Sequence, residues 1–241
     1  MKKSEKELFD TYYTSIFSRS NVFSKQEYEN ACLEFERNYG RFLTSYKDEK
    51  ILDIGCGTGH FLYYLETKAF TDFMGIDVSA QQVDFCRKNV SKKLKEADAF
   101  EFLKDKKNIY QVIVANDFLE HISKGDILEL LKSIKDALKK GGIFLMRTPN
   151  LGNPFSIFPR YKDFSHELGF TERSLYQILS TAGFRQIQIL PWERDMDRSF
   201  KRFIEQRLSK TIDFILTKLY QIQGFVAPRI LTPLLLAAAR K

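Results

Sequence analysis

The stretch KILDIGCGTGHFL, from Lys50 to Leu62, decides the fold of this 241-residue chain. It begins with an apolar run, 51–54, that is typical of a strand buried in a parallel sheet. Gly55, Gly57 and Gly59 then follow at alternate positions, and their small size lets a ligand approach the backbone closely. A strand, a glycine turn and a helix N-terminus together predict a site for a nucleotide-like ligand.

An acid in the same stretch separates it from dinucleotide-binding turns. Those turns have the spacing G-x-G-x-x-G, whereas here Asp53 precedes the spacing G-x-G-x-G. A carboxylate is a poor neighbour for a pyrophosphate and a good one for a cationic ligand. Thr58 is expected to cap the helix that begins at His60. The stretch resembles the first motif of the class I S-adenosylmethionine-dependent methyltransferases, D-x-G-C-G-T-G, which implies that Asp53 faces the methionine end of that cofactor.

Further acids follow the next strands. Asp77 ends a second apolar run, where a carboxylate can accept both ribose hydroxyls of a nucleoside. The segment around Asp98 resembles the family's third motif, whose acid contacts the adenine amino group. The strand 110–116 leads into Asp117, and the resemblance implies that this strand ends beneath the cofactor's sulfur. The expected cofactor-binding residues are Asp53, Gly55, Cys56, Gly57, Gly59, Asp77, Val78, Asp98, Ala99, Asn116, Asp117 and Phe118.

The alternation of strands and helices predicts an α/β fold. We expect a Rossmann-like class I methyltransferase: a seven-stranded, mostly parallel sheet with an antiparallel last strand and helices on both faces. Residues 1–46 are expected to form an N-terminal helical cap. Residues 47–192 and 229–241 are expected to form the methyltransferase core, with 193–228 as a helical insertion between the last two strands.

Two of the three histidines lie where substrate chemistry is expected. Methyl transfer from a sulfonium is an in-line displacement, so the protein must align the acceptor and remove its proton. His121 follows the fourth strand, and His166 lies in a long loop, 150–171, that also contains Asp163. Either histidine can be the general base, with Asp163 as the third catalytic candidate, while His60 is assigned to packing or to the methionine end.

The long loop also carries the expected acceptor-binding residues. Its segment RYKDFSHELGFT resembles a loop of bacterial methyltransferases encoded with surface-polysaccharide genes. Arg160 and Tyr161 are expected to hold an anionic or hydroxyl-rich acceptor, and Tyr12 and Tyr13 are expected to contribute from the N-terminal helices.

The expected function is O-methylation, by S-adenosylmethionine, of a hydroxyl or phosphate-type oxygen of a sugar or glycan precursor in surface-polysaccharide synthesis, with S-adenosylhomocysteine as product. The alternative is a small-molecule O-methyltransferase acting on a quinone or secondary metabolite. Nucleic-acid methylation ranks lower because the sequence offers no aromatic and basic stacking platform, so we expect no nucleic-acid partner. A non-catalytic cofactor-binding module is the remaining alternative.

A metal-dependent alternative comes from the segment after the fourth strand. Asp117-x-x-Glu120-His121 resembles the E-x-x-E-H pattern of ubiquinone-biosynthesis and small-RNA 2′-O-methyltransferases, which bind a divalent cation. Here the first acid is an aspartate with a shorter reach. The expected site therefore contains no metal, and the cation remains the alternative.

The charge of the chain is concentrated near its end. The net charge is +7, and from Arg194 onward ten bases face four acids. Within 193–228 these bases alternate with apolar residues at helical spacing, which predicts an amphipathic cationic insertion. It can pack against the domain, form a homodimer or contact an anionic membrane surface. The N-terminal residues lack the apolar core of a signal peptide, so a cytoplasmic protein, with the inner face of the membrane as a second location, is expected.

Overall fold

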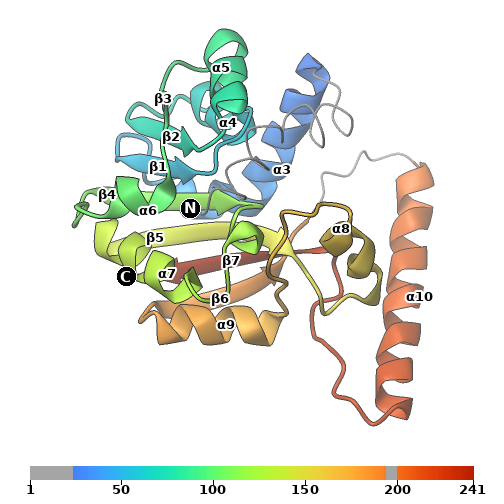
Figure 1. Ribbon diagram of the computed structural model, residues 1–241. Coiled ribbons are helices and arrows are strands. Elements are labelled where there is room, and N and C mark those ends of the chain that lie inside the picture. Colours follow the sequence, from blue (N-terminus) through green and yellow to red (C-terminus); the bar gives the residue numbers. More distant parts are fainter. Residues whose placement is uncertain (1–23, 194–199) are drawn as a thin grey trace.

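The computed structural model describes residues 24–193 and 200–241. They form one seven-stranded sheet in the order β3-β2-β1-β4-β5-β7-β6 (Figure 1). Strands β1 to β5 pair in parallel, whereas β7 runs antiparallel to both β5 and β6. This is the Rossmann-like sheet expected from the sequence. The strands are β1 (Ile51–Ile54), β2 (Phe73–Asp77), β3 (Leu94–Glu96), β4 (Tyr110–Asn116), β5 (Leu138–Pro149), β6 (Arg185–Pro191) and β7 (Leu234–Arg240).

Helices cover both faces of this sheet. Side chains of α3, α4 and α5 pack with one face, and those of α6, α7 and α9 pack with the other. Successive side chains of a strand point to opposite faces, so a strand that is apolar at every position needs helices on both. In β4, Val112 and Val114 point to the first face, while Ile113 and Ala115 point to the second. The helices are α3 (Lys25–Leu43), α4 (His60–Thr67), α5 (Ala80–Asn89), α6 (Ala99–Leu103), η2 (Leu119–His121), α7 (Ile127–Ala137), η3 (Pro154–Ser156), α8 (Ile157–Tyr161), α9 (Glu172–Thr181) and α10 (Phe200–Ile222).

Contacts between distant segments set the bounds of α7 and β7. α7 ends at Ala137, because Leu138 already pairs with Tyr110 of β4. Strand β7 begins at Leu234, and the segment before it lies outside the sheet. The side chain of Asn150 donates to main-chain carbonyls at 230 and 232 and holds that segment outside the sheet.

The segment between β6 and β7 contains α10, which stands beside the body of the protein next to α8 (Figure 1). Its described contact with the loop after β5 includes a hydrogen bond from the Tyr220 hydroxyl to the carbonyl of Gly152, at 3.2 Å. The apolar side chains along its outer stripe are 42–77% exposed, from Ile204 to Ile222. Within the described ranges, no helix combines the length and the apolar character that crossing a bilayer requires. Tyr12 and Tyr13 lie outside the described residues.

Candidate functional site

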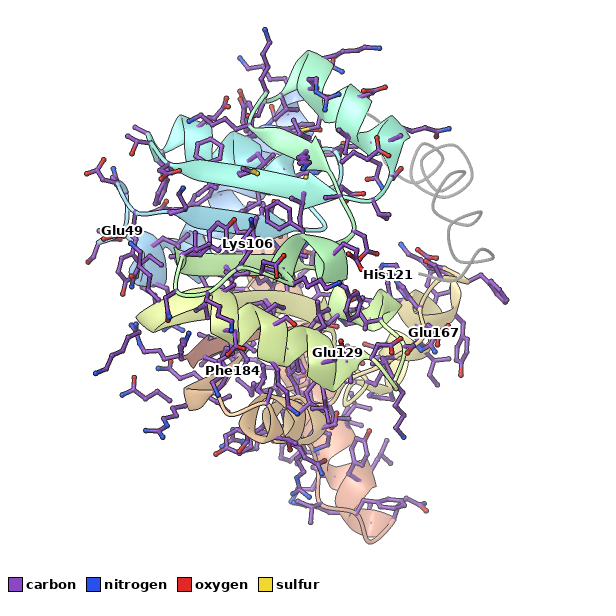
Figure 2. All side chains as sticks on the ribbon, turned by 60° about the vertical axis from the view of Figure 1, so that its left-hand side comes forward. Glu49, Lys106, His121, Glu129, Glu167 and Phe184 are labelled. Carbon is purple, nitrogen blue, oxygen red and sulfur yellow. The ribbon has the colours of Figure 1, made fainter. Side chains whose placement is uncertain are left out.

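A cavity of about 1230 Å³ opens at the carboxyl ends of β1, β2 and β4. The parallel register brings these ends together, since Ile54 pairs with Ile76 on one side and with Ala115 on the other. Figure 2 shows His121 and Glu167 at this edge of the sheet, toward which the strands point. The volume exceeds that of a typical small-molecule pocket, so it has room for a cofactor and an acceptor together.

The glycine turn forms the cofactor side of the cavity. Gly55, Gly57 and Gly59 have φ angles of 69°, 53° and 91°, which side chains other than hydrogen rarely allow. A Cβ on Gly55 would lie 2.6 Å from the ring of Phe118, so that ring closes directly over the turn. Gly59 itself is the N-cap of α4 and no side chain caps that helix, so the expected Thr58 cap is wrong. The positive φ of Gly59 directs the chain into the helix.

Asp77 fixes the glycine turn and faces the cavity. Its Oδ2 accepts a hydrogen bond from the backbone N–H of Gly57 at 2.8 Å, and its Oδ1 accepts one from Ser79 at 2.9 Å. Burial raises the pKa of this carboxyl, and these N–H donors act in the opposite direction. A carboxylate oxygen has more than one lone pair, so both oxygens can also accept from a ribose diol.

Asp53 fits a cationic group. Its side chain is 1% exposed, and its Oδ1 has no hydrogen-bond partner within the described part of the chain. Burial raises the pKa of Asp53 well above its usual value, and the charge of Asp77 raises it further. A buried carboxylate that lacks a partner is stabilised by a cation, and the α-ammonium of S-adenosylmethionine carries that charge. The residues present therefore fit the cofactor that the sequence predicts.

The other expected cofactor residues line the same cavity, with partners of their own. Asp98 caps α6 by accepting from the N–H groups of Phe100 and Glu101. Asn116 accepts from the hydroxyl of Tyr39 at 2.7 Å, and its Nδ2 has no partner among the described residues. Val78 and Ala99 also lie on the wall, and the direct contacts of these residues with the cofactor stay predictions.

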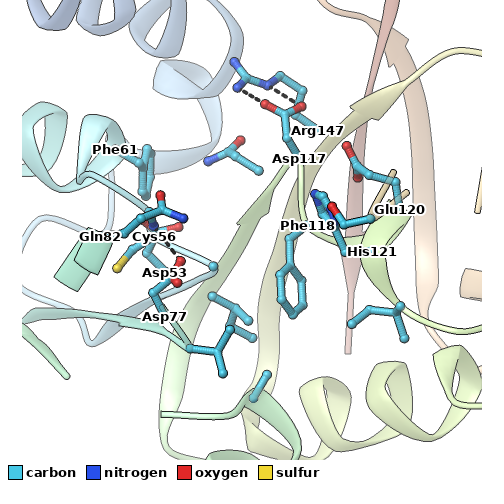
Figure 3. A pocket seen from close by; sticks show the side chains of 18 of the residues that line it. Asp53, Cys56, Phe61, Asp77, Gln82, Asp117, Phe118, Glu120, His121 and Arg147 are labelled. Carbon is cyan, nitrogen blue, oxygen red and sulfur yellow. Dashed lines mark hydrogen bonds and ion pairs between the residues drawn. The ribbon is translucent and has the colours of Figure 1, made fainter. Parts of the chain in front are cut away.

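Arg147 was not predicted, and it binds the residue that follows β4. Its guanidinium makes a bidentate ion pair with Asp117, which has a left-handed φ of 49° (Figure 3). The guanidinium also lies 4.8 Å from the centre of the Trp192 ring. The Asp117 carboxylate is therefore committed to Arg147. The signal in the sequence was an arginine at the end of an otherwise apolar strand.

The wall opposite the glycine turn is polar; we call its five residues the acceptor wall: Glu120, His121, Asp163, Ser165 and His166. Figure 3 shows Glu120 and His121 across the cavity from Asp53 and Asp77. The rings of the two histidines lie 4.7 Å apart, centre to centre. Ser165 Oγ lies 2.6 Å from Asp163 Oδ1 and 2.9 Å from His121 Nδ1.

Burial changes the protonation of this wall. It lowers the pKa of His121 to about 4, with the neighbouring His166 as the next cause, and it also lowers the pKa of His166. The pKa of Glu120 is raised well above its usual value by burial and then by the charge of Asp117. Both imidazoles are therefore neutral at pH 7. Ser165 was not predicted, and Glu120 was named only in the metal-dependent alternative.

Main-chain hydrogen bonds hold the long loop against the end of β4. The carbonyl of Glu120 accepts from the N–H groups of Glu167 and Leu168, at 2.8 and 2.9 Å. Arg160 donates to the carbonyls of His166 and Glu167, so its guanidinium braces the loop. Neither Arg160 nor the exposed Tyr161 belongs to the cavity wall, whereas the neighbouring Lys162 does. Acceptor binding by Arg160 and Tyr161 stays a prediction, and the bracing role explains the position of Arg160.

Comparison with known proteins identifies the family. Residues 23–189 match the family model described as a methyltransferase domain. Phosphoethanolamine N-methyltransferase 3 of Arabidopsis thaliana is 26% identical over 185 residues, which cover 72% of this chain and 36% of that enzyme. The chain thus spans about a third of the length of that relative. Carboxy-S-adenosyl-L-methionine synthase of Nautilia profundicola is 28% identical over 213 residues, covering 76% of this chain and 88% of that enzyme.

A solved structure shares the fold. The S-adenosylmethionine-dependent methyltransferase of Archaeoglobus fulgidus superposes with a TM-score of 0.66 at 22% identity, over 90% of this chain and 97% of that one. The family match, the glycine turn and the two cofactor carboxylates agree with one another. The chain belongs to the methyltransferase-domain family, and it is a class I methyltransferase whose cofactor is S-adenosylmethionine.

Proposed function

We propose that this methyltransferase acts on an oxygen of a sugar or glycan precursor, a hydroxyl or a phosphate-type oxygen, in the synthesis of a surface polysaccharide. The observation that carries the proposal is the acceptor wall. It places two neutral imidazoles across the cavity from the buried carboxylate of Asp53. Such a wall suits a polar acceptor molecule better than an apolar or aromatic molecule.

The roles of the chain's own residues follow from this geometry. Bound S-adenosylmethionine supplies a methyl group on a sulfonium, so the transfer needs an acceptor oxygen in line with that group. Asp53 and Asp77 fix the cofactor end of the line, and His121 and His166 contact the acceptor oxygen at the other end. Asp163 and Ser165 orient the imidazole of His121 through the hydrogen bonds described above. Lys162, on the cavity wall, favours an acceptor with negative charge.

The similarity to phosphoethanolamine N-methyltransferases supports a second candidate, a phosphorylated amine as acceptor. The quinone and secondary-metabolite alternative remains a third. The test is to incubate the full chain with methyl-labelled S-adenosylmethionine and three acceptor sets: nucleotide sugars and sugar phosphates, quinols, and phosphoethanolamine. Mass spectrometry of the product locates the methyl group. An O-methylated sugar supports the proposal, and methylation confined to nitrogen or to quinols contradicts it.

His166→Gln tests the acceptor wall separately from the cofactor site. Turnover is expected to fall by at least about 100-fold, the usual range for a group that acts on the transferred proton. Calorimetric titration with S-adenosylhomocysteine is expected to give wild-type affinity. Unchanged turnover in the variant would remove His166 from the reaction.

The proposal extends to how the acceptor arrives. The exposed apolar stripe of α10, flanked by Arg207, Lys210 and Lys218, favours contact of residues 193–228 with an anionic membrane surface, where lipid-linked precursors lie at the inner face. A homodimer through the same stripe is the alternative. Co-sedimentation with vesicles rich in anionic lipid tests for membrane contact, and light scattering of the free protein tests for a dimer. A dimer that does not bind the vesicles would contradict membrane contact.

A further inference from the structure

The acceptor wall contains three potential metal ligands from two distant segments. One oxygen of Glu120 and one ring nitrogen each of His121 and His166 all lie within 4.8 Å of one another. Glu120 and His121 belong to η2, directly after β4, and His166 belongs to the loop after β5. The main-chain bonds from residues 167 and 168 to Glu120 fix this arrangement without using any of the three ligand side chains.

Two of these side chains have a buried atom that lacks a partner. Glu120 is 1% exposed; its Oε2 accepts from Thr148 Oγ1 at 3.1 Å, while its Oε1 has no partner within the described ranges. The His166 side chain is 9% exposed, and its Nδ1 likewise has no partner there. A buried polar atom without a partner is destabilising, and such atoms are uncommon in folded proteins. A bound ion would satisfy both.

The Asp163 carboxylate lies behind both imidazoles. The Ser165 hydroxyl has a single proton, which it donates to Asp163 Oδ1 at 2.6 Å, so it accepts from Nδ1–H of His121. This assigns the lone pair of His121 to Nε2. Nε2 of His166 lies 3.9 Å from Asp163 Oδ2, too far for a hydrogen bond, and the negative charge of Asp163 favours the proton on Nε2 and the lone pair on Nδ1. A carboxylate behind metal-bound histidines is a common arrangement, because it fixes the tautomer and the ring orientation.

The structure also corrects the ligand set suggested by the sequence pattern. Asp117 is the first acid of the D-x-x-E-H segment, but its carboxylate is held by Arg147. His166, which follows that segment by 45 positions, takes its place beside Glu120 and His121. The observed set has two nitrogens and one oxygen, whereas the D-x-x-E-H pattern offered two carboxylates and one imidazole.

We propose that Glu120, His121 and His166 bind a divalent transition-metal ion at the acceptor end of the cavity. Two imidazoles and a carboxylate suit Zn²⁺, Mn²⁺ or Fe²⁺, and three protein ligands leave positions open for a further oxygen. Mg²⁺ and Ca²⁺ prefer all-oxygen ligands and fit less well. This replaces the expectation of a site without metal.

The use of the ion rests on the proposed function, whereas its binding does not. An acceptor hydroxyl on an open position has a lowered pKa and loses its proton to water. Its oxygen then forms the new bond to carbon as the bond from sulfur to that carbon breaks, and the sulfonium becomes a neutral thioether. With the ion bound, both histidines are its ligands and water takes the proton in place of an imidazole base; without the ion, either histidine can be that base.

The test measures binding without any acceptor. The full chain is treated with EDTA, dialysed, and titrated calorimetrically with MnCl₂, ZnSO₄ and MgCl₂. We expect one site per chain for Mn²⁺ and Zn²⁺ and at least tenfold weaker binding of Mg²⁺. Glu120→Gln and His166→Asn are expected to weaken the transition metals by 100-fold or more, and Asp163→Asn by about 10–100-fold.

Two matched controls lie in the same cavity. Glu129→Gln and His60→Gln remove an acid and an imidazole from other parts of the wall, and both are expected to bind the ions as the wild type does. Thermal unfolding followed by circular dichroism confirms that each variant is folded. If the ligand variants do not fold, pulsed electron paramagnetic resonance of the wild type with Mn²⁺ provides the readout, with nitrogen couplings from imidazoles expected.

The outcomes separate the two proposals. No stoichiometric binding of Mn²⁺ or Zn²⁺ by the wild type, ligand variants that bind as well as the wild type, or bound Mn²⁺ without nitrogen coupling would each overturn the metal site. Metal binding in an enzyme that methylates no sugar overturns the proposed acceptor and leaves the metal site standing.

Discussion

Replacing Asp77 by alanine tests the link between the glycine turn and the cofactor. In the wild type the buried carboxylate accepts hydrogen bonds from the N–H groups of Gly57 and Ser79, at 2.8 and 2.9 Å. The substitution leaves both donors without that acceptor and removes the group that faces the ribose. We therefore expect it to change both the free energy of unfolding and the affinity for cofactor.

The magnitudes follow from the number of hydrogen bonds. Two bonds to a charged acceptor contribute about 3–6 kcal/mol in total. Relief of the burial that raises the pKa of Asp77 offsets part of this, so we expect a net loss of about 2–4 kcal/mol in the free energy of unfolding. In a chain of this length that lowers Tm by roughly 4–16 °C. Loss of two further bonds to the ribose, at about 1.5 kcal/mol each, weakens cofactor binding by about 100-fold.

The assays are thermal unfolding without ligand and calorimetric titration with S-adenosylhomocysteine. Asp84→Asn is the matched control, because Asp84 is an exposed acid on α5 that pairs with Arg87. The control should match the wild type in both assays. An Asp77→Ala protein that binds the cofactor within about threefold of the wild type, below the value of one hydrogen bond, would refute the assignment of Asp77 to the ribose.

Three further predictions concern the helix start at Gly59, the buried Asp53 and the ion pair at the end of β4. Gly59→Ala places a Cβ against Cys86 Sγ at a φ of 91°, so circular dichroism during thermal melting should show a loss of about 1–3 kcal/mol in the free energy of unfolding, and an unchanged Tm would contradict the strain. Because the pKa of Asp53 is raised, its carboxylate becomes protonated as the pH falls through that pKa. Cofactor affinity is therefore expected to decline between about pH 8 and pH 5, which lies above the usual Asp range. Asp53→Asn should remove that part of the decline. Arg147→Met should lower the free energy of unfolding by about 1 kcal/mol, because the exposure of Asp117 weakens its ion pair with Arg147. A double-mutant cycle with Asp117→Asn should assign this loss to the ion pair.

The cofactor side of the cavity could be predicted because its information is local. The glycine turn and the acids at the ends of β1 and β2 each depend on a few consecutive residues. Parallel pairing then brings the strand ends together, which the alternation of elements already implies. The confirmed sheet and family rest on the same short motifs.

The acceptor side could be predicted only in part, because its contacts join distant segments. His121 and His166 were both named, but their contact depends on main-chain bonds from residues 167 and 168 to residue 120. Arg160 was assigned to the acceptor because its loop resembles that of methyltransferases encoded with surface-polysaccharide genes. The loop's own carbonyls need donors, however, and Arg160 satisfies two of them. Arg147 was missed because the surrounding residues predict a plain strand.

The tie between Glu120 and the long loop has an evolutionary consequence. Because it is formed by a carbonyl and two N–H groups, almost any side chains at 167 and 168 can maintain it. The exposed positions of the preceding stretch, Phe158 and Phe164, are thus free to differ while Arg160 and the acceptor wall keep their places. The choice of acceptor can therefore change through such exposed positions while the groups at the reacting oxygen stay the same.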